Sequence, residues 1–378
     1  MRIDVISAKK IKDSRGEYTI EISVNGVKAS SPSGKSKGKY ETPSYHNSLE
    51  WNVKAINSFK EIKNIEIKSF DDLNKIENLI KKKFNLKNVK EFGANSLFAL
   101  ESAILKALAK SLKKELWCLI NPNASKLPFP LGNAVGGGVH SYNKNKPEFQ
   151  EFLLIPRERK FETNLKIMNE TYLKLGKILK SKKKNDEGAW ECNKSNEEIL
   201  EILGKFKDIK IGIDVASSTF YRNENYYYKK RIFDRETQIR YINYLIDKYK
   251  IAYIEDPIFE EDFSGFSRIV KKSLVTGDDL TATNNKRLNE GLKLNSINAM
   301  IIKPNQNGSL VELKKIFENC RKNKIRTILS HRSGETIDSA LADYAFGFQA
   351  DYIKCGISGK EREVKLNRMV EIERGLRK

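Results

Sequence analysis

Six short apolar runs in the second half of the chain each end at a polar side chain that could take part in chemistry. Three of these side chains are carboxylates, which bind hard divalent cations, and the next three are a lysine, a histidine and a second lysine. A lysine beside a cation site can bind an anion or remove a proton from it. The six residues are Asp214, Glu255, Asp278, Lys303, His331 and Lys354.

The spacing of these residues indicates the scaffold that holds them. From Glu255 onward they recur about every 25 positions, which is the length of one strand, one helix and two loops. That repeat is typical of a (β/α) barrel, whose active site lies at the C-terminal ends of its strands. Any one carboxylate could instead cap the helix that follows it. Three in consecutive units, followed by a lysine, favour a Mg²⁺ site, since Mg²⁺ keeps several waters and needs only two or three carboxylates.

The lysine and histidine positions suggest further roles. Lys303 ends an apolar strand, where burial and nearby cations would lower its pKa and make it a usable base, unless its side chain reaches solvent. Of the three histidines in the chain, His140 and His331 lie in Gly/Ser-rich loops at predicted strand ends. Arg332 and Ser333 add a guanidinium and a hydroxyl, a combination that suits a phosphate group.

The first part of the chain predicts a smaller α+β domain over residues 1–125. Segments 2–8 and 18–24 alternate apolar and polar residues, and Asn25-Gly26 supplies a tight turn before the next short strand. Helical patterns follow, and prolines then mark a linker. Beyond it, the barrel domain is expected to span residues 126–378.

Residues 30–43, here called the flap, form a Gly/Ser/Lys-rich loop between these elements. The segment ASSPSGKS satisfies a relaxed P-loop pattern. A P-loop must follow a buried strand and open a helix, and Gly38 and Pro43 prevent a long helix here. The flap is better interpreted as a cationic loop that could close over an anion.

Composition limits the other classes of function. The chain has 378 residues and a formal net charge of +21, but its lysines are spread along the whole sequence without a nucleic-acid-binding motif, so a solvated surface is favoured. Its four cysteines have no paired spacing and are expected to be reduced thiols. No apolar run is long enough for a membrane helix, and the start lacks the apolar core of a signal peptide, so a cytoplasmic location is expected.

Sequence blocks along nearly the full length of the chain match one family. They include KDSRGEYTIEISV (12–24), SPSGKSKG (31–38), NAVGGGVHS (133–141), FQEFLLIP (149–156), NDEG (185–188), YIEDPIFEEDF (253–263), TGDDLTATN (276–284), IIKPNQNGSLVE (301–312) and LSHRSGETIDS (330–339). In these blocks the chain resembles the enolase family. The resemblance implies an α/β barrel of the enolase type, a modified TIM barrel with the order ββαα(βα)6, beside the smaller α+β domain. It also implies a lyase that uses Mg²⁺ in the reversible dehydration of 2-phosphoglycerate to phosphoenolpyruvate.

The resemblance also implies a role for each matching residue. Lys303 corresponds to the base that takes the C2 proton, and Glu187, with Glu151 beside it, to the acid that helps the C3 hydroxyl leave. Two Mg²⁺ ions per active site are implied, the second arriving with the substrate. The implied metal ligands are Asp214, Glu255 and Asp278 for the first ion and Ser36 for the second. The implied substrate-binding residues are His140, Gln150, His331, Arg332, Ser333 and Lys354.

The chain departs from the family pattern in several places, including the flap, the loop 185–189 and the segment after Lys354, which is one residue shorter. Lys35 and Lys37 stand in the flap where small neutral residues are usual, and Asn185 and Ala189 replace glycines in the loop 185–189, here called the acid loop. These changes leave two alternatives open: a divergent enzyme that abstracts an alpha proton from another phosphorylated or carboxylated acid, or a non-catalytic basic protein that binds RNA or another polyanion. The resemblance implies a small phosphorylated carboxylic acid as substrate and a homo-oligomer, a dimer or larger. Neither a membrane nor a nucleic-acid partner is expected.

Overall fold

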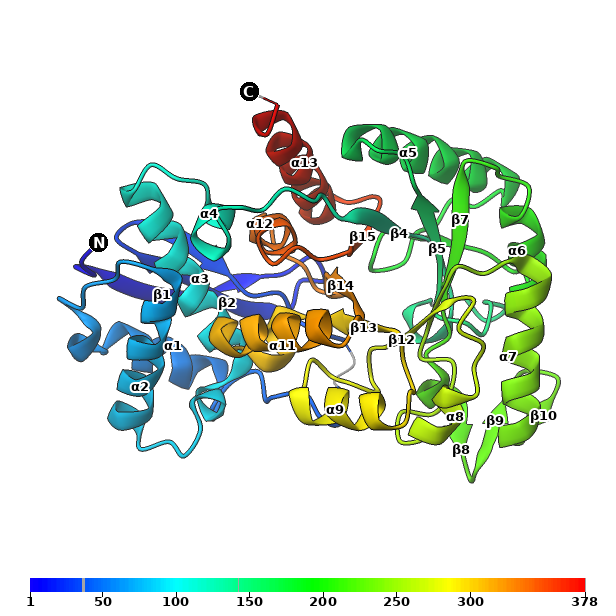
Figure 1. Cartoon of the computed structure of the whole chain (residues 1–378), viewed down its shortest axis with the longest axis horizontal. Helices are drawn as coiled ribbons and strands as arrows, with labels where there is room; N and C mark the ends of the chain where they lie inside the picture. Colours follow the sequence, from blue (N-terminus) through cyan, green and yellow to red (C-terminus); the bar gives the residue numbers. More distant parts are fainter. Residues whose placement is uncertain (36–37, 142, 378) are drawn as a thin grey trace.

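The computed structural model describes residues 1–35, 38–141 and 143–377. The N-terminal elements gather at one end of the molecule and a barrel of strands at the other (Figure 1). The N-terminal part contains an antiparallel sheet in the order β1-β2-β3 with helices packed against it. Its strands and helices are β1 (Ile6–Lys12), β2 (Tyr18–Val24), β3 (Val27–Ser30), α1 (Leu49–Asn57), α2 (Leu73–Phe84), α3 (Ala94–Ser111) and α4 (Leu116–Ile120).

The first strand lies later in the chain than the sequence pattern predicted. The prediction was residues 2–8, whereas β1 begins at Ile6, which pairs with Val24. The side-chain oxygen of Asn25 accepts hydrogen bonds from the backbone N–H groups of Asp4 and Val5, at 2.9 and 3.1 Å. Asn25 therefore accepts hydrogen bonds from two backbone N–H groups that would pair with a neighbouring strand if β1 began earlier.

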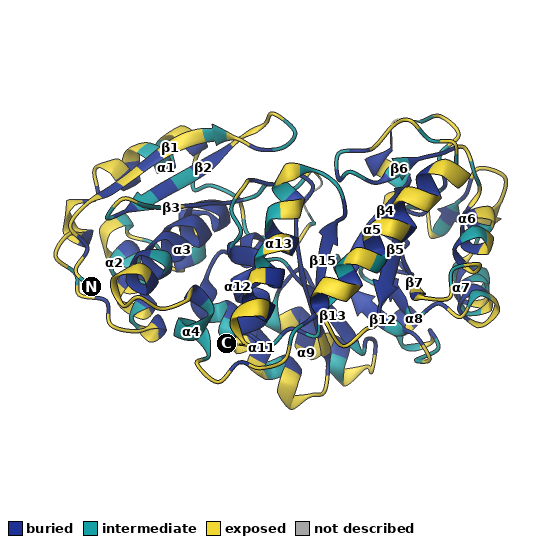
Figure 2. Cartoon of the chain, turned by 90° about the horizontal axis from the view of Figure 1, so that it is seen from above, coloured by how far each residue is buried: buried dark blue, intermediate teal, exposed yellow. Residues whose placement is uncertain are grey.

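Helix α3 packs against the N-terminal sheet and against α10 (Pro304–Asn307) of the barrel domain. Most of its length is buried, as the burial colours in Figure 2 show. This position between two layers explains why its sequence is apolar almost all round rather than along one stripe.

Eight strands close into a barrel, because β15 pairs with β4. All neighbours are parallel except β5, which runs antiparallel to β4 and to β7. The predicted fold class is confirmed, including the ββαα(βα)6 order. The strands are β4 (Phe129–Gly136), β5 (Glu151–Pro156), β7 (Ile209–Asp214), β11 (Tyr253–Glu255), β12 (Leu274–Gly277), β13 (Ala299–Ile302), β14 (Arg326–Ser330) and β15 (Tyr352–Gly356).

Helices follow the barrel strands in chain order and cover the outside of the barrel (Figure 1). A short strand, β6 (Trp190–Glu191), extends the sheet beside β4, and β8 (Tyr221–Arg222), β9 (Asn225–Tyr227) and β10 (Ile232–Phe233) form a separate small sheet. The helices are α5 (Phe161–Ile178), α6 (Asn196–Leu203), α7 (Arg235–Tyr249), α8 (Phe263–Ser267), α9 (Asn285–Lys293), α10, α11 (Leu310–Lys322), α12 (Ala340–Gly347) and α13 (Lys360–Gly375).

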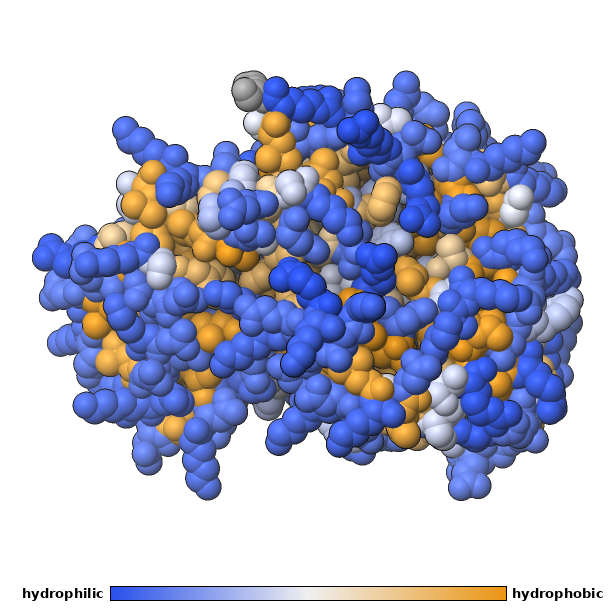
Figure 3. Space-filling view, viewed as in Figure 1, coloured by the Kyte–Doolittle hydropathy of each residue, from blue (hydrophilic) through white to orange (hydrophobic). Residues whose placement is uncertain are grey.

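The interior of the barrel is packed with apolar side chains rather than open from end to end. Leu153, Tyr253, Ile301 and Ile328 belong to this inner cluster and are fully buried. The face seen in Figure 3 is mostly hydrophilic, with hydrophobic residues showing between polar side chains. Among the described residues, no helix combines the length and apolar character that crossing a bilayer requires.

Candidate active site

The strand ends bring the predicted site residues to one mouth of the barrel. Asp214 pairs directly with Glu255 on the neighbouring parallel strand. Glu151 pairs with Asp214 from the other side, and because β5 runs antiparallel, its first residue rather than its last lies at this mouth. A cavity of about 380 Å³ opens there. The predicted residues that line it are His140, Gln150, Glu151, Glu187, Asp214, Asp278, Lys303, His331, Arg332, Ser333 and Lys354.

Glu255 does not line the cavity, but it contacts Lys354, which does. The Lys354 ammonium lies 2.9 Å from Glu151, 3.4 Å from Asp214 and 2.7 Å from Glu255. Burial would lower the pKa of Lys354, but these carboxylates raise it well above the usual value. Burial and then the charge of Asp214 raise the pKa of Glu255 to about 8. Lys354 is therefore a fixed positive charge among carboxylates that repel one another.

The second lysine is also paired with a carboxylate. The Lys303 ammonium contacts the Oδ2 atom of Asp278 directly. Burial would raise the pKa of Asp278, but Lys303 outweighs it and lowers the pKa below the usual value. Conversely, burial would lower the pKa of Lys303, and Asp278 raises it instead. Gln306 donates a hydrogen bond to the other oxygen of Asp278 at 3.3 Å. Lys303 is accordingly a protonated ammonium in this arrangement.

The carboxylates at the mouth fit a hard cation by their chemistry. Asp214, Glu255 and Asp278 are buried, and the pKa of Asp256 is raised well above normal by burial and by Asp279 and Asp278. Oxygens of Asp256, Asp278 and Asp279 lie within 4.8 Å of one another. A divalent cation would relieve the repulsion among such buried carboxylates.

The predicted metal ligands are divided between the two lysines. Asp214 and Glu255 face Lys354, while Asp278 faces Lys303. Among the described residues, the two acidic or histidine sets with ligand atoms within 4.8 Å are His140–Glu151–Glu187 and Asp256–Asp278–Asp279, so the predicted triad does not form such a set in this arrangement. Ser36, predicted to meet a second ion, lies outside the described residues.

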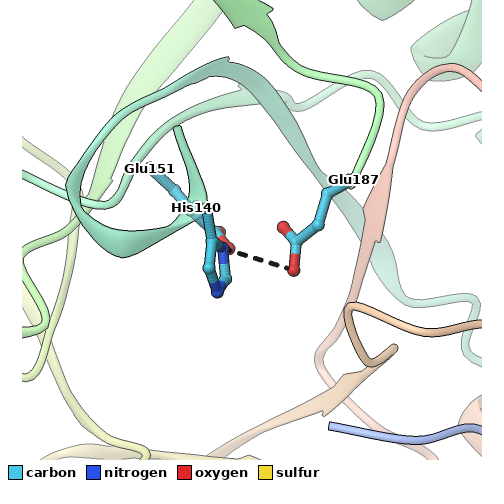
Figure 4. A group of neighbouring side chains, drawn as sticks. All are labelled: His140, Glu151 and Glu187. Carbon is cyan, nitrogen blue, oxygen red and sulfur yellow. Dashed lines mark ion pairs between the residues drawn. The ribbon is translucent and has the colours of Figure 1, made fainter. Parts of the chain in front are cut away.

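The side of the cavity across the barrel from Lys303 carries two carboxyl groups and a histidine, whose side chains lie together in Figure 4. The His140 Nδ1 atom lies 3.5 Å from Glu187 and 3.9 Å from Glu151, and Asn133 donates a hydrogen bond to Glu187 at 2.9 Å. Burial raises the pKa of Glu151 well above normal, whereas His140 holds the pKa of Glu187 well below normal despite burial. Burial lowers the pKa of His331 well below normal. The pKa values of these two neighbouring carboxyl groups are thus shifted in opposite directions.

The third wall carries the residues expected to bind phosphate. The Arg332 guanidinium is buried and pairs with Glu41 of the flap at 3.0 Å. Its Nη1 atom also donates to the side-chain oxygen of Asn305 at 3.1 Å. The Ser333 hydroxyl accepts hydrogen bonds from the backbone N–H of Lys35 at 2.8 Å and from Arg15 at 3.4 Å. The flap therefore lies against the same loop that carries Arg332 and Ser333.

The whole chain matches two domains of one family. Residues 3–120 match the N-terminal domain of enolase, and residues 124–378 match the C-terminal TIM barrel domain of enolase. Relatives named enolase are 38% identical in Ehrlichia canis, over 99% of this chain and 96% of the relative, and 37% identical in Methanosphaera stadtmanae, over 99% and 97%. A relative from Archaeoglobus fulgidus, also named enolase, is 35% identical over 99% and 97%.

The chain belongs to the enolase family. It is an enzyme, a carbon–oxygen lyase of the enolase type, and the resemblance found in its sequence blocks is confirmed. Its barrel domain carries all the described side chains that line the candidate active site except those of the flap.

Several residues of this enolase-type site were missed by the reading of strand ends. Asp256 and Asp279 directly follow Glu255 and Asp278, so the acidic doublets in the sequence were the available signal. Glu41 and Arg362 gave no such signal. Glu41 meets Arg332 from the flap, and Arg362 reaches the site from α13, where it donates to two backbone carbonyls.

The altered acid loop is held by the residue that replaces a glycine. The Asn185 side-chain oxygen accepts hydrogen bonds from the backbone N–H groups of Glu187 and Ala189, at 3.0 and 2.9 Å. The glycine that remains, Gly188, has a φ of +79°, and a Cβ atom there would lie 2.1 Å from the carbonyl oxygen of Ser358. Asn185 thus fixes a loop in which Gly188 is sterically required.

Proposed function

We propose that this enolase-family chain catalyses the reversible dehydration of 2-phosphoglycerate to phosphoenolpyruvate with Mg²⁺. One observation carries the proposal: the base and acid candidates face each other across a single cavity. In the closed order of strands, β13 and β5 lie four strands apart in a barrel of eight, so Lys303 and Glu151 stand on opposite sides. A substrate between them can lose its C2 proton on one face and its C3 hydroxyl on the other.

Lys303 is assigned as the base for the C2 proton. It is buried at the cavity wall and can act only when its ammonium has lost a proton, which contact with Asp278 opposes. Bound to Asp214, Glu255 and Asp278, and to Ser36 for a second ion that arrives with substrate, Mg²⁺ would supply positive charge for the substrate carboxylate. Lys354, held by Glu151 and Glu255, is assigned to face the same substrate carboxylate with a further positive charge.

The carboxyl pair on the opposite wall is assigned as the acid. Glu187 is assigned to the departing hydroxyl, with Glu151, whose pKa is raised by burial, as its partner. His140 and Asn133 keep Glu187 in place through its two oxygens. Arg332 and Ser333 are assigned to the phosphate, with His331 and Gln150 completing the cavity wall.

The first experiment follows phosphoenolpyruvate formation by absorbance in the presence of Mg²⁺. Lys303→Ala should lower kcat by at least about a hundredfold, because a positioned base contributes that much or more. Lys272→Ala, which removes an exposed lysine paired with Asp247 at the N-terminal end of β12 rather than at the mouth, is the matched control. Equal turnover in Lys303→Ala and wild type would contradict the assignment of the base.

A second readout separates the base from the acid. Exchange of the C2 proton of 2-phosphoglycerate in D₂O, followed by NMR, needs only the base. Glu187→Gln should keep this exchange while dehydration falls by about a hundredfold. Lys303→Ala should abolish both. Loss of exchange in Glu187→Gln would show that Glu187 is not confined to the acid step.

Both alternatives left by the sequence are tested by the same preparation. A divergent enzyme would exchange the alpha proton of another phosphorylated or carboxylated acid and not of 2-phosphoglycerate. A basic RNA-binding protein would show steeply salt-dependent RNA affinity without turnover. A purely binding role gives no reason for a buried base and two buried carboxyl groups with opposed pKa shifts to lie in one cavity.

Three predictions from the sequence are not tested by these observations. They are a domain boundary between residues 125 and 126, homo-oligomerisation and a cytoplasmic location.

A further inference from the structure

An ion pair joins the flap to the acid loop at the rim of the cavity. The Lys35 ammonium lies 3.1 Å from the Oδ2 atom of Asp186, and both side chains are partly buried. Lys35 also lines the cavity, and Asp186 directly precedes Glu187. The pair therefore links a flap residue that departs from the family pattern to the loop that carries the proposed acid.

Both loops are anchored to the segment around Ser333. Ser33 of the flap exchanges two backbone hydrogen bonds with Gly334, at 2.7 and 2.9 Å, and the backbone N–H of Lys35 donates to the Ser333 hydroxyl. From the other side, the buried Arg362 donates to the carbonyl oxygens of Asp186 and Ser333, at 2.8 Å each. The three segments form one unit, in which Lys35 contacts the side chain of Asp186 and Arg362 holds its backbone.

A second flap lysine has a different partner. The Lys39 ammonium lies 3.0 Å from Glu261, and Tyr40 donates a hydrogen bond to the same carboxylate. Glu261 lies in the loop after β11, away from the acid loop. Lys35 and Lys39 therefore have the same charge and lie in the same loop, but Lys35 contacts the loop of Glu187 whereas Lys39 contacts Glu261.

We propose that Lys35 is a positioning residue that holds the acid loop through Asp186, so that Glu187 keeps its place against His140 and Asn133. The inference rests on the proposed function, because it concerns the acid of that reaction. Asn185 and Gly188 restrict the backbone on both sides of Glu187. Because the loop cannot bend freely between them, a displacement of Asp186 would also displace Glu187. Direct binding of the substrate phosphate by Lys35 is the competing role.

Turnover and exchange together distinguish these roles. Lys35→Ala should lower kcat roughly tenfold with little change in KM, since a misplaced catalytic group slows the chemical step. The C2 proton should still exchange in D₂O at the wild-type rate, because Lys303 is untouched. Asp186→Asn should give the same result, and the control Lys272→Ala should match wild type in all three measurements. A phosphate-binding lysine would instead raise KM, and Asp186→Asn would not reproduce its loss.

Three further measurements test the ion pair itself. The double variant Lys35→Asp with Asp186→Lys should recover most of the lost kcat. Raising NaCl should lower wild-type kcat toward the value of Lys35→Ala, because a partly exposed pair is screened. A zero-length carbodiimide should cross-link Lys35 to Asp186 in the wild-type protein, as detected by peptide mass spectrometry, and this readout needs no turnover.

The outcomes separate the two proposals. An active wild type in which Lys35→Ala and Lys272→Ala have equal kcat would overturn the positioning role alone. A rise in KM without loss of kcat, or failure of the charge swap to recover kcat, would do the same. A wild type that neither turns over 2-phosphoglycerate nor exchanges its proton would overturn the proposed function, and the positioning role with it.

Discussion

The two lysines of the site neutralise the carboxylates that are proposed to hold Mg²⁺. Lys354 contacts Glu151, Asp214 and Glu255, and Lys303 contacts Asp278. The two lysines that are proposed to act on the substrate therefore also offset the repulsion among the buried carboxylates. Removing one partner of a buried ion pair leaves an uncompensated charge, which costs far more than the pair itself contributes.

This arrangement gives a prediction for Lys354→Met. The variant should lose about 3 kcal/mol of folding free energy in EDTA, because three buried carboxylates lose their shared cation. Mg²⁺ should raise its Tm more than it raises the Tm of wild type, since the cation can replace the missing charge. Thermal unfolding in EDTA and in MgCl₂ measures this. Equal shifts in Tm for the two proteins would show that Lys354 does not carry that charge balance.

At the scale of elements, helix α3 meets the start of α11 through a buried carboxyl group. One oxygen of Glu101 accepts a hydrogen bond from the backbone N–H of Leu310 at 2.6 Å. Burial, and then the nearby charge of Glu77, raise the pKa of Glu101 well above normal. The folded state therefore prefers the protonated form. The stability that this preference contributes is complete below the unfolded pKa and is lost as the pH rises through the folded pKa.

Glu101→Gln should accordingly be more stable than wild type at pH 8 by at least about 1 kcal/mol, with the difference shrinking toward pH 5. The amide keeps the oxygen that accepts from Leu310 and never ionises. Urea unfolding at the two pH values measures the difference. Glu170→Gln on the exposed face of α5 is the control. A difference that is the same at both pH values would rule out an ionised Glu101 as its cause.

Sequence patterns predicted the barrel better than the orientation of its strands. The recurrence from Glu255 to Lys354 follows from the repeat of parallel units, which needs no knowledge of contacts. The periodicity carries no information on the direction of β5, which turns back after β4; the enolase-type order came from the resemblance. Only that direction brings Glu151, at the start of its strand, to the mouth.

The same limit applies within the site. Asp214, Asp278 and Lys303 could be found because each ends an apolar run. Glu41 and Arg362 could not, because their contacts join segments far apart in the chain, and no local pattern encodes such a pairing. The pairing of each lysine with a carboxylate is likewise a property of the assembled mouth and not of any one strand.

At the scale of the whole molecule, the formal net charge of +21 sets the response to salt. Like charges on a compact protein repel one another, and added salt screens that repulsion. The Tm should therefore rise as NaCl increases from low to physiological concentration. The exposed pair Lys182→Glu with Lys183→Glu should raise the low-salt Tm and weaken its dependence on NaCl. A Tm that is independent of NaCl in both proteins would contradict a role for net charge in stability.

Closure of the barrel through β4 and β15 also has a consequence for how the enzyme is made. The first strand of the barrel, β4, can pair with β15 only after β15 has been synthesised. Arg362, which donates hydrogen bonds to two loops of the site, is translated later still. A growing polypeptide on the ribosome therefore has no assembled pocket. Products that terminate before Arg362 are therefore expected to be inert rather than partly active.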